Sequence, residues 1–404
     1  MTAPKLRFKE FDEDWNLSTL ANISSIITGS TPSTSNREYY DGEFLFVSPA
    51  DIQENRYVEK TKTTLTANGF SKCRHIPENS VLFVCIGSTI GKVAQNKVIC
   101  ATNQQINAVI PNKGYSSDFL YVLLEKLAPS IKLNAGVQAV PLINKTEFGK
   151  TLLNLPISDE QTKIATFLSA VDEKISQLTQ KHQLLSQYKQ GMMQKLFSQQ
   201  IRFKADDGSD FGEWEEKLLS EIGSFKNGLN KDKESFGFGY PFVNLMDVFG
   251  KKIVETEYLG LVDATPKDLE NYDLRKGDVL FIRSSVKAEG VGQTALVIND
   301  LKNVVYSGFL IRFRDSYGLD LGFKKYCFMN NEFRLRLLAK STTSANTNIN
   351  QESLSALFIK IPCLEEQSKI ANFLSAIDQK IAVVAQQIEQ AKQWKKGLLQ
   401  QMFV

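Results

Sequence analysis

The residues best suited to chemistry on a phosphate form a short glycine-rich run, but the run is incomplete. Gly87–Lys92 (GSTIGK) has the glycines and the lysine of a phosphate-binding loop, yet it is one residue too short. Val93 stands where that loop needs a serine or threonine for Mg²⁺. The glycine pairs in Gly237–Gly239 and Gly290–Gly292 have no dinucleotide-binding context. These motifs therefore predict no catalytic phosphate site.

The chain also has few residues that could bind a metal ion or act as a catalytic nucleophile. The chain has two histidines, His75 and His182, and five cysteines without any CxxC spacing, so the ligand spacing of a zinc site is missing. It contains neither the Asn-Pro-Pro-Tyr type of motif of an adenine methyltransferase nor a paired-carboxylate nuclease motif. We expect no catalytic residue, no metal site and no cofactor in this chain.

Polar side chains gather instead in loops beside short apolar runs. They supply the donors and acceptors that contact phosphates and read base edges. Ordinary turns use the same residue types, so each loop alone is also compatible with a structural role. The candidate DNA-contacting residues of the first half are Ser30, Thr31, Ser33, Ser35, Asn36, Arg37, Ser88, Thr89, Lys92 and Gln105. Those of the second half are Lys226, Asn227, Asn230, Lys231, Arg283, Ser284, Ser285, Lys287, Thr343, Asn346 and Asn348.

Apolar runs bounded by turn residues predict the buried strands that would position these loops. The predicted strands are Phe44–Val47, Val81–Val84, Ala108–Ile110, Val279–Ile282 and Phe309–Ile311. Tyr115–Leu127 and Leu321–Leu338 have a helical pattern. We therefore expect two compact bodies of mixed α/β structure, Trp15–Asn154 and Trp214–Lys360.

One segment of the sequence occurs twice, once after each body. Pro156–Ile175 matches Pro362–Ile381 at a constant offset of 206 residues. Apolar residues recur at alternating spacings of four and three from Ile164 to Leu185 and from Ile370 to Ala391, which is the heptad pattern of a coiled coil. We expect two long helices that pack on each other. Two unrelated core helices are the alternative.

The helix starts and helix surfaces carry further signals. Ser158 followed by Gln161 predicts a capping box at the first start. At the second start, acidic residues alone favour the helix N-terminus. Asp172 and its repeat Asp378 have lysines nearby, and we interpret them as contacts to a helix or to a partner protein.

Each body is preceded by a repeated arm, Leu6–Lys9 or Ile201–Lys204, followed by a tryptophan and a short helix. The predicted boundaries are 1–154 for the first body with its arm, 155–200 for the first long helix, 201–360 for the second body with its arm, and 361–404 for the second long helix. A duplicated frame that carries divergent bodies indicates two versions of one task with different targets.

Composition sets broad limits on function. The chain has 404 residues, 42% of them hydrophobic, which suits two or three domains with real cores. No apolar run approaches 18 residues, and the first ten residues lack a signal-peptide core. An odd, scattered set of cysteines fits a reducing compartment, so we expect a cytoplasmic protein. A net charge of +3 neither supports nor excludes a nucleic-acid partner.

The chain resembles the specificity subunits of type I restriction-modification systems. The resemblance covers essentially all of the chain and rests on the repeated helix starts, the Gly29–Pro32 opening and the Asn103–Gln105 segment. The second body departs from the pattern, with Asn227–Asn230 in place of the Thr-Pro opening and Ser307-Gly308 in place of Asn-Gln. The residues of the repeated helix starts are Pro156, Glu160, Gln161, Ile164, Ala165 and Leu168, and Pro362, Glu366, Gln367, Ile370, Ala371 and Leu374.

This resemblance implies an α+β fold in which two target recognition domains are separated by an antiparallel coiled coil. Each domain would read half of a bipartite DNA sequence. Two methyltransferase subunits would dock on the repeated regions and carry S-adenosylmethionine, and restriction subunits would use ATP and Mg²⁺. The chain itself would have no catalytic role. A coiled-coil scaffold without DNA contact and a degenerate nuclease or methyltransferase are the alternatives.

Overall fold

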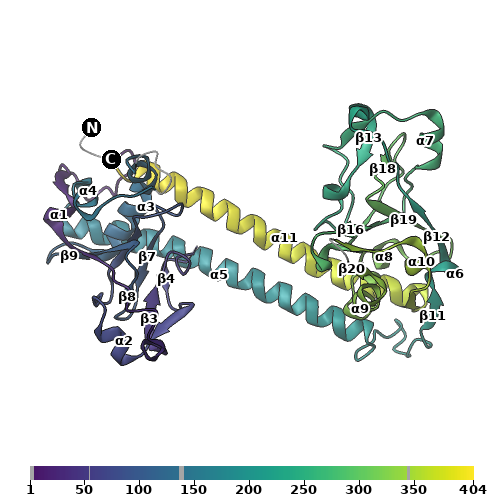
Figure 1. Cartoon of the computed structure of the whole chain (residues 1–404), viewed down its shortest axis with the longest axis horizontal. Helices are drawn as coiled ribbons and strands as arrows, with labels where there is room; N and C mark the ends of the chain where they lie inside the picture. The colour runs from purple at the N-terminus through teal and green to yellow at the C-terminus, as the bar shows by residue number, and fades with distance from the viewer. Residues whose placement is uncertain (1–3, 54, 136–140, 344–345) are drawn as a thin grey trace. The chain divides into compact units, whose positions relative to one another are not determined.

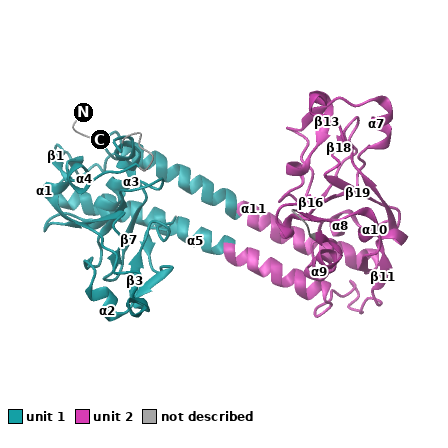
Figure 2. Cartoon of the chain, in the orientation of Figure 1, with its two compact units in different colours: residues 1–182, 384–404 teal, residues 183–383 magenta. Residues whose placement is uncertain are grey.

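The computed structural model describes residues 4–53, 55–135, 141–343 and 346–404. The chain divides into two compact units, residues 1–182 with 384–404 and residues 183–383 (Figure 2). Each unit therefore contains one body together with part of each long helix.

The first unit contains the elements of the first body and the start of α5 (Figure 1). In chain order they are β1 (Asn16–Thr19), α1 (Leu20–Ile23), β2 (Ser24–Thr28), η1 (Arg37–Tyr39), β3 (Tyr40–Val47), β4 (Tyr57–Val58), β5 (Thr63–Leu65), α2 (Ala67–Ser71), β6 (Val81–Val84), β7 (Val93–Asn96), β8 (Ala101–Thr102), β9 (Ile106–Pro111), α3 (Ser117–Leu133), α4 (Lys145–Gly149), β10 (Leu152–Leu155) and α5 (Ser158–Phe197).

The second unit contains the end of α5, the second body and the start of α11. The elements are β11 (Glu215–Leu218), α6 (Leu219–Ile222), β12 (Gly223–Asn227), η2 (Lys233–Ser235), β13 (Phe236–Val243), η3 (Leu245–Asp247), β14 (Gly260–Val262), α7 (Pro266–Asn271), β15 (Val279–Ile282), β16 (Ser284–Ser285), η4 (Ala288–Gly290), β17 (Thr294–Leu296), β18 (Val305–Tyr306), β19 (Leu310–Asp315), α8 (Leu321–Cys327), α9 (Asn331–Lys340), β20 (Thr342–Thr343), β21 (Thr347–Asn348), α10 (Gln351–Ser355), β22 (Phe358–Ile361) and α11 (Leu364–Gln401).

The two bodies share one topology although their sequences differ. The main sheet has the order β2-β9-β6-β7-β4 in the first body and β12-β19-β15-β17 in the second. A small sheet, β5-β3-β8 or β14-β13-β18, and a strand pair, β1-β10 or β11-β22, also recur. The register is kept as well, because Val81 faces Val109 where Val279 faces Phe313. The second body adds the sheet β16-β21-β20.

The strands form where continuous apolar runs are buried on both faces. Every residue of Val81–Val84 and of Val279–Ile282 is buried, which confirms these two predicted strands. The predicted helix at Leu321–Leu338 was wrong in one respect, because it is two helices, α8 and α9. Asn330 separates them: its amide donates to the Cys327 carbonyl, and its side-chain oxygen accepts from the Phe333 N–H and caps α9.

The long helices contact each other within each unit. In the first unit Phe167 of α5 packs edge-to-face on Trp394 of α11, and Asp172 accepts from Lys395 at 2.7 Å. In the second unit Lys189 of α5 pairs with Asp378 of α11, also at 2.7 Å. In the first unit the start of α5 thus meets the end of α11, and in the second unit the end of α5 meets the start of α11. The prediction that Asp172 and Asp378 make helix contacts is confirmed.

The predicted capping box at Ser158 was wrong. The Gln161 side chain does not return to Ser158; its amide donates to the Pro156 carbonyl, and its oxygen accepts from the Ser116 N–H. Gln367 makes the same pair of bonds, to Pro362 and from Asp320. The repeated glutamine therefore ties each long helix to the start of α3 or α8.

The glutamate beside it anchors the arm that leads into each body. Glu160 accepts two hydrogen bonds from the Arg7 guanidinium, at 2.8 and 2.7 Å, and Glu366 accepts the same pair from Arg202, at 3.1 and 2.7 Å. Both carboxylates are fully buried. In the residues described, no helix is both long enough and apolar enough to cross a bilayer.

Candidate nucleic-acid interface

Each body contains the same tight turn immediately before β9 or β19. In the first body, the Asn103 side-chain oxygen accepts from the Gln105 N–H at 3.1 Å, and the Asn103 carbonyl accepts from the first N–H of β9 at 3.2 Å. In the second body, the Ser307 hydroxyl accepts from the Phe309 N–H at 3.2 Å, and its carbonyl accepts from the first N–H of β19 at 2.8 Å. Short polar side chains close both turns by the same mechanism.

The turn lies against the loop after β2 or β12 at a very close approach. A Cβ on Gly29 would lie 2.2 Å from the Asn103 carbonyl oxygen, and one on Gly228 would lie 2.2 Å from the Ser307 carbonyl oxygen. No side chain fits at either position. This close contact explains why the two glycines recur in the repeated frame.

The next residues of that loop also meet the turn. The Thr31 hydroxyl donates to the Gln104 side-chain oxygen at 2.7 Å. At the matching place in the second body, Asn230 lies over Gly308, where a Cβ would come within 1.9 Å of the Asn230 side-chain oxygen. A polar side chain from one loop therefore covers the middle of the turn in both bodies.

In each body, backbone hydrogen bonds attach two more segments to this turn. The Cys85 N–H donates to the Gln105 carbonyl, and the Arg283 N–H donates to the Phe309 carbonyl, both at 2.8 Å. The carbonyls of Cys85 and Arg283 accept in turn from the N–H groups of Ile143 and Ile349, both at 2.9 Å. The fold thus gathers four loops that are far apart in sequence into one cluster in each body. In the second body, Ser284–Ser285 also pairs with Thr347–Asn348.

The remaining predicted residues of the first body lie in this cluster or in the loop between β2 and η1. The Ser33 and Ser35 hydroxyls bond to each other at 2.8 Å, and Asn36 caps η1, whose first residue is the exposed Arg37. Ser88 is exposed and Thr89 half-buried in the turn that follows β6.

Lys92 is engaged inside the body. Its ammonium donates to the Ile52 carbonyl at 2.8 Å and to the Pro49 carbonyl at 3.4 Å. These bonds tie the glycine-rich run to a neighbouring loop, so they describe a structural lysine.

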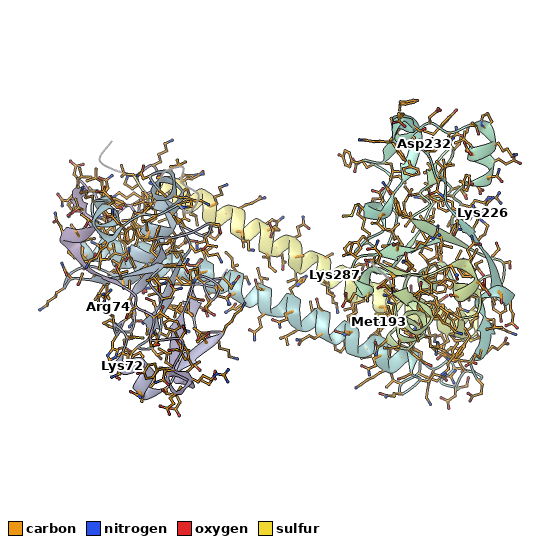
Figure 3. The ribbon with its side chains drawn as sticks, viewed as in Figure 1. Lys72, Arg74, Met193, Lys226, Asp232 and Lys287 are labelled. Atoms are coloured by element: carbon orange, nitrogen blue, oxygen red, sulfur yellow. The ribbon has the colours of Figure 1, made fainter. Side chains whose placement is uncertain are left out.

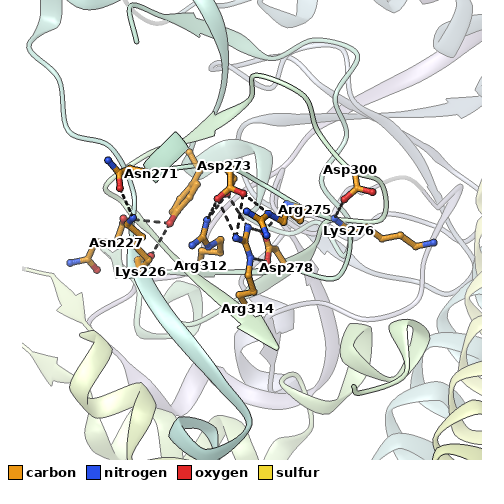
Figure 4. Close-up of polar contacts among 11 residues, drawn as sticks. Lys226, Asn227, Asn271, Asp273, Arg275, Lys276, Asp278, Asp300, Arg312 and Arg314 are labelled. Atoms are coloured by element: carbon orange, nitrogen blue, oxygen red, sulfur yellow. Dashed lines mark hydrogen bonds and ion pairs between the residues drawn. The ribbon is translucent and has the colours of Figure 1, made fainter. Parts of the chain in front are cut away.

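Two lysines predicted in the second body also have partners. Lys226 donates to the Asn271 side chain at 3.1 Å (Figure 4). Its ammonium also lies 5.4 Å from the centre of the Tyr272 ring. Lys231 pairs with Asp268 at 3.0 Å, and this carboxylate also accepts from the backbone N–H of Thr265, the main cause of its lowered pKa. Among the other predicted residues, Asn227 ends β12, Asn348 donates to the Asn346 carbonyl, Thr343 lies in β20, Arg283 is half-buried and Lys287 is exposed (Figure 3).

A partly buried charge cluster contains Asp273, Asp278 and Arg314 (Figure 4). The Arg314 guanidinium donates to both oxygens of Asp278, at 2.8 and 2.7 Å, and these hydrogen bonds raise the pKa of Arg314. Burial alone would raise the pKa of Asp273, but hydrogen bonds from Arg275 and Arg314 lower it. Because the charge of Arg314 is paired within the body, this arginine stabilises β19 and leaves little charge for a ligand.

Two exposed residues beside the loop clusters were not among the predicted site residues. Arg74 is exposed; its N–H donates to the Ser30 hydroxyl at 2.9 Å and its guanidinium donates to the Thr28 carbonyl at 2.7 Å (Figure 3). Phe309 was expected to begin a buried strand, but β19 begins at Leu310, and 59% of the Phe309 side chain is exposed. Only the tertiary contacts of these residues reveal their place, since neither stands in a polar loop motif.

The first unit also holds a cavity of about 770 Å³ between the body and the long helices. Arg56, Glu125, Asp172 and Lys395 line it. Lys395 donates to both Glu125 and Asp172, at 2.6 and 2.7 Å, and so links α3 to both long helices. Within the residues described, no three His, Cys, Asp or Glu side chains come together in a way that would hold a metal ion.

Known proteins resemble this chain in sequence and in fold. The MjaVIII type I restriction enzyme specificity subunit of Methanocaldococcus jannaschii is 24% identical over 402 residues, covering 96% of this chain and 91% of that protein. The EcoKI specificity subunit of Escherichia coli is 22% identical, covering 89% and 81%. The match to the MjaIX specificity subunit, at 27% identity, spans 60% of that protein's length.

Solved structures agree at the level of the fold. A type I restriction-modification S subunit from M. genitalium matches with a TM-score of 0.59 and 16% identity, covering 100% of this chain and 99% of that one. A chain from a study of type I system assembly matches with a TM-score of 0.60 and 20% identity. A family model, described as the type I restriction modification DNA specificity domain, matches residues 12–187 and 212–393. These two matches take in most of the 404 residues, and the chain therefore belongs to the family of type I restriction-modification DNA specificity domains.

Proposed function

We propose that the chain is the sequence-specific DNA-binding subunit of a type I restriction-modification complex, and that each body reads one half of a bipartite target. One observation carries this proposal: both bodies build the same four-loop cluster and fill it with different side chains. The turn presents Asn103–Gln105 in one body and Ser307–Phe309 in the other. A shared scaffold with divergent contact groups suits two different base sequences.

The long helices would act as the spacer between the two half-sites. Their heptad pattern and their contacts within each unit support an antiparallel coiled coil as the spacer. The anchoring bonds of Gln161 and Gln367 support the same role, because they fix each helix start to its own body. The length of the coiled coil would then set the number of unspecified base pairs.

The complex would supply the chemistry that this chain lacks. Two methyltransferase subunits would dock on the repeated regions and bring S-adenosylmethionine, and restriction subunits would bring ATP-dependent cleavage with Mg²⁺. The duplicated frame supports two docking sites, since each unit repeats the bonds of the arm and the helix start. The chain would contribute binding and positioning without catalysis.

Methylome sequencing of cells with and without this gene tests the proposed function. We expect one bipartite motif, with a fixed spacer, to lose its adenine methylation when the gene is deleted and to regain it on complementation. The control is a deletion of the matching methyltransferase gene, which should abolish the same motif. An unchanged methylome in a strain whose methyltransferase subunit is active would contradict the proposal.

A further inference from the structure

Phe309 is an aromatic residue exposed among buried neighbours. Its side chain is 59% exposed, while Ser307 is 4% and Leu310 is 0% exposed. The turn holds it there through two backbone bonds, because its N–H donates to the Ser307 hydroxyl and its carbonyl accepts from the Arg283 N–H. Neither bond uses the ring, so the fold fixes the position of the ring without burying it.

Gln105 occupies the same place in the first body. Its N–H donates to the Asn103 side chain, and its carbonyl accepts from the Cys85 N–H at the distance found for Phe309 and Arg283, 2.8 Å. The Gln105 side chain is half-buried and bonded within the body, because its oxygen accepts from the Asn103 amide at 3.0 Å and its amide donates to the Ile86 carbonyl at 3.4 Å. An exposed phenylalanine at the same place can instead contact the methyl group of a thymine. The third residue of this turn is therefore bonded internally in the first body and exposed in the second.

The surroundings of Phe309 favour DNA as its contact. Arg283 is bonded to it through the backbone, the exposed Lys287 follows a few residues later, and the polar pair Ser284–Ser285 lies between them. Asn230 covers the glycine that precedes Phe309. Such a combination can bind DNA, because cations contact phosphates while apolar and hydrogen-bonding groups contact base edges.

We propose that Phe309 is a specificity-determining residue of the second body and contacts one thymine methyl group in the major groove of the second half-site. This inference rests on the proposed function. It goes further by naming the base and the type of contact. It requires that the second half-site contain at least one A·T pair.

The first test uses variants of the full chain assembled with its methyltransferase subunits. Phe309→Ala should relax the methylated motif at one A·T position of the second half-site and leave the first half-site unchanged. Leu335→Ala is the matched control, because Leu335 is also 59% exposed but lies on α9, and its motif should equal that of the wild type. Loss of methyltransferase assembly in Phe309→Ala, with normal thermal unfolding, would overturn the proposal in favour of a protein contact.

The second test begins with the wild-type complex, so its main result does not depend on a variant. Thymine is replaced by uracil, one position at a time, in duplexes that carry the motif, and binding of the wild-type complex is measured. Removing one methyl contact should weaken binding about fourfold at a single position of the second half-site. The same replacement should leave the affinity of Phe309→Ala unchanged. If the wild-type complex binds its motif specifically but no uracil replacement weakens binding, the inference about Phe309 is wrong. If the wild-type complex shows no sequence preference at all, the proposed function is wrong as well.

Discussion

At the residue scale, the basic side chains of the loops divide into two groups. Lys92 and Lys231 are bonded inside their bodies, to backbone carbonyls and to Asp268. Arg37 and Lys287 are exposed. Arg74 is exposed as well, but its guanidinium also donates to the Thr28 carbonyl. An ammonium group that already satisfies buried carbonyls contributes to folding, whereas an exposed cation can replace the counterions of a phosphate.

This division predicts different effects for two lysine substitutions. Lys287→Met should weaken binding of the assembled complex to all duplexes evenly and lower the salt dependence of the affinity by about one unit. Lys92→Met should leave that salt dependence unchanged and lower the free energy of unfolding by about 1–3 kcal/mol, because two carbonyls lose their donor. Titrations at several salt concentrations and urea unfolding measure the two effects. Equal salt dependence in both variants would contradict the assignment.

The sequence could identify the loops but not the residues that each loop presents. Polar composition pointed to Thr31 and Asn230, and the fold places both over the turn of their body. The same reasoning missed Phe309, because an apolar residue next to an apolar run is predicted to belong to the buried strand. Which side chain is left exposed depends on backbone bonds to segments that lie far away in sequence.

At the element scale, the arm and the helix start form a repeated unit held by one buried carboxylate. Glu160 receives its two bonds from Arg7, whereas Glu366 receives a third from the Trp214 indole at 3.0 Å. The indole nitrogen of the equivalent Trp15 has no partner among the described residues. The first carboxylate therefore depends more heavily on its arginine.

Arg7→Met should consequently destabilise the protein more than Arg202→Met does. Leaving a buried carboxylate without its partner costs about 3–5 kcal/mol, and one remaining charge-assisted bond, from Trp214, should recover about 1.5–3 kcal/mol of that cost. Urea unfolding of the two variants gives the comparison, each serving as the control for the other. Equal losses, or a larger loss for Arg202→Met, would contradict this account of the two anchors.

The contact between the long helices in the second unit carries a dependence on pH. Burial lowers the pKa of Lys189 to about 8, although its hydrogen bond to Asp378 acts in the opposite direction. Lys252 and the Tyr326 ring also face this ammonium. Because the pKa in the folded state lies below that of the unfolded chain, the stability this group contributes is complete above about pH 10.5 and is lost as pH falls through about 8.

The free energy of unfolding of the wild type, relative to Lys189→Met, should therefore rise between pH 8 and 10. An increase of about 1–2 kcal/mol is expected, since one pKa unit corresponds to about 1.4 kcal/mol and the site is partly open to water. Urea unfolding at several pH values measures it, and the difference between the two proteins at pH 6 and 7 provides the baseline. A difference that stays constant from pH 6 to 10 would contradict the burial of this lysine.

Much of the element structure followed from periodicity. The heptad pattern predicted two long packed helices, and continuous apolar runs predicted the strands Val81–Val84 and Val279–Ile282. The role of Gln161 could not be predicted, because its partners are a proline carbonyl outside the helix and the N–H of Ser116 in another element. A glutamine at this position of a helix start can either cap the helix or bind a distant segment, and the sequence pattern is the same in both cases.

At the scale of the whole molecule, one frame has been used twice. The bodies share their sheet order, their register and the turn before β9 or β19, while the residues that the turn exposes differ. Within each unit the body is fixed to its own helix start by a glutamine and a glutamate. We propose that this arrangement makes each body a replaceable module, because the glutamine and the glutamate that bind it belong to the repeated part of the sequence.

Replacing one body tests whether each body reads its own half-site. Residues Trp15–Asn154 are exchanged for the equivalent body of another specificity subunit with a known motif, and the methylome of cells expressing the hybrid with its methyltransferase subunits is sequenced. We expect one half of the methylated motif to become that of the donor. The other half and the spacer length should remain unchanged, because the second body and both long helices are untouched. A hybrid that methylates DNA with changes in both halves, or with neither half changed, would contradict the assignment of one half-site to each body.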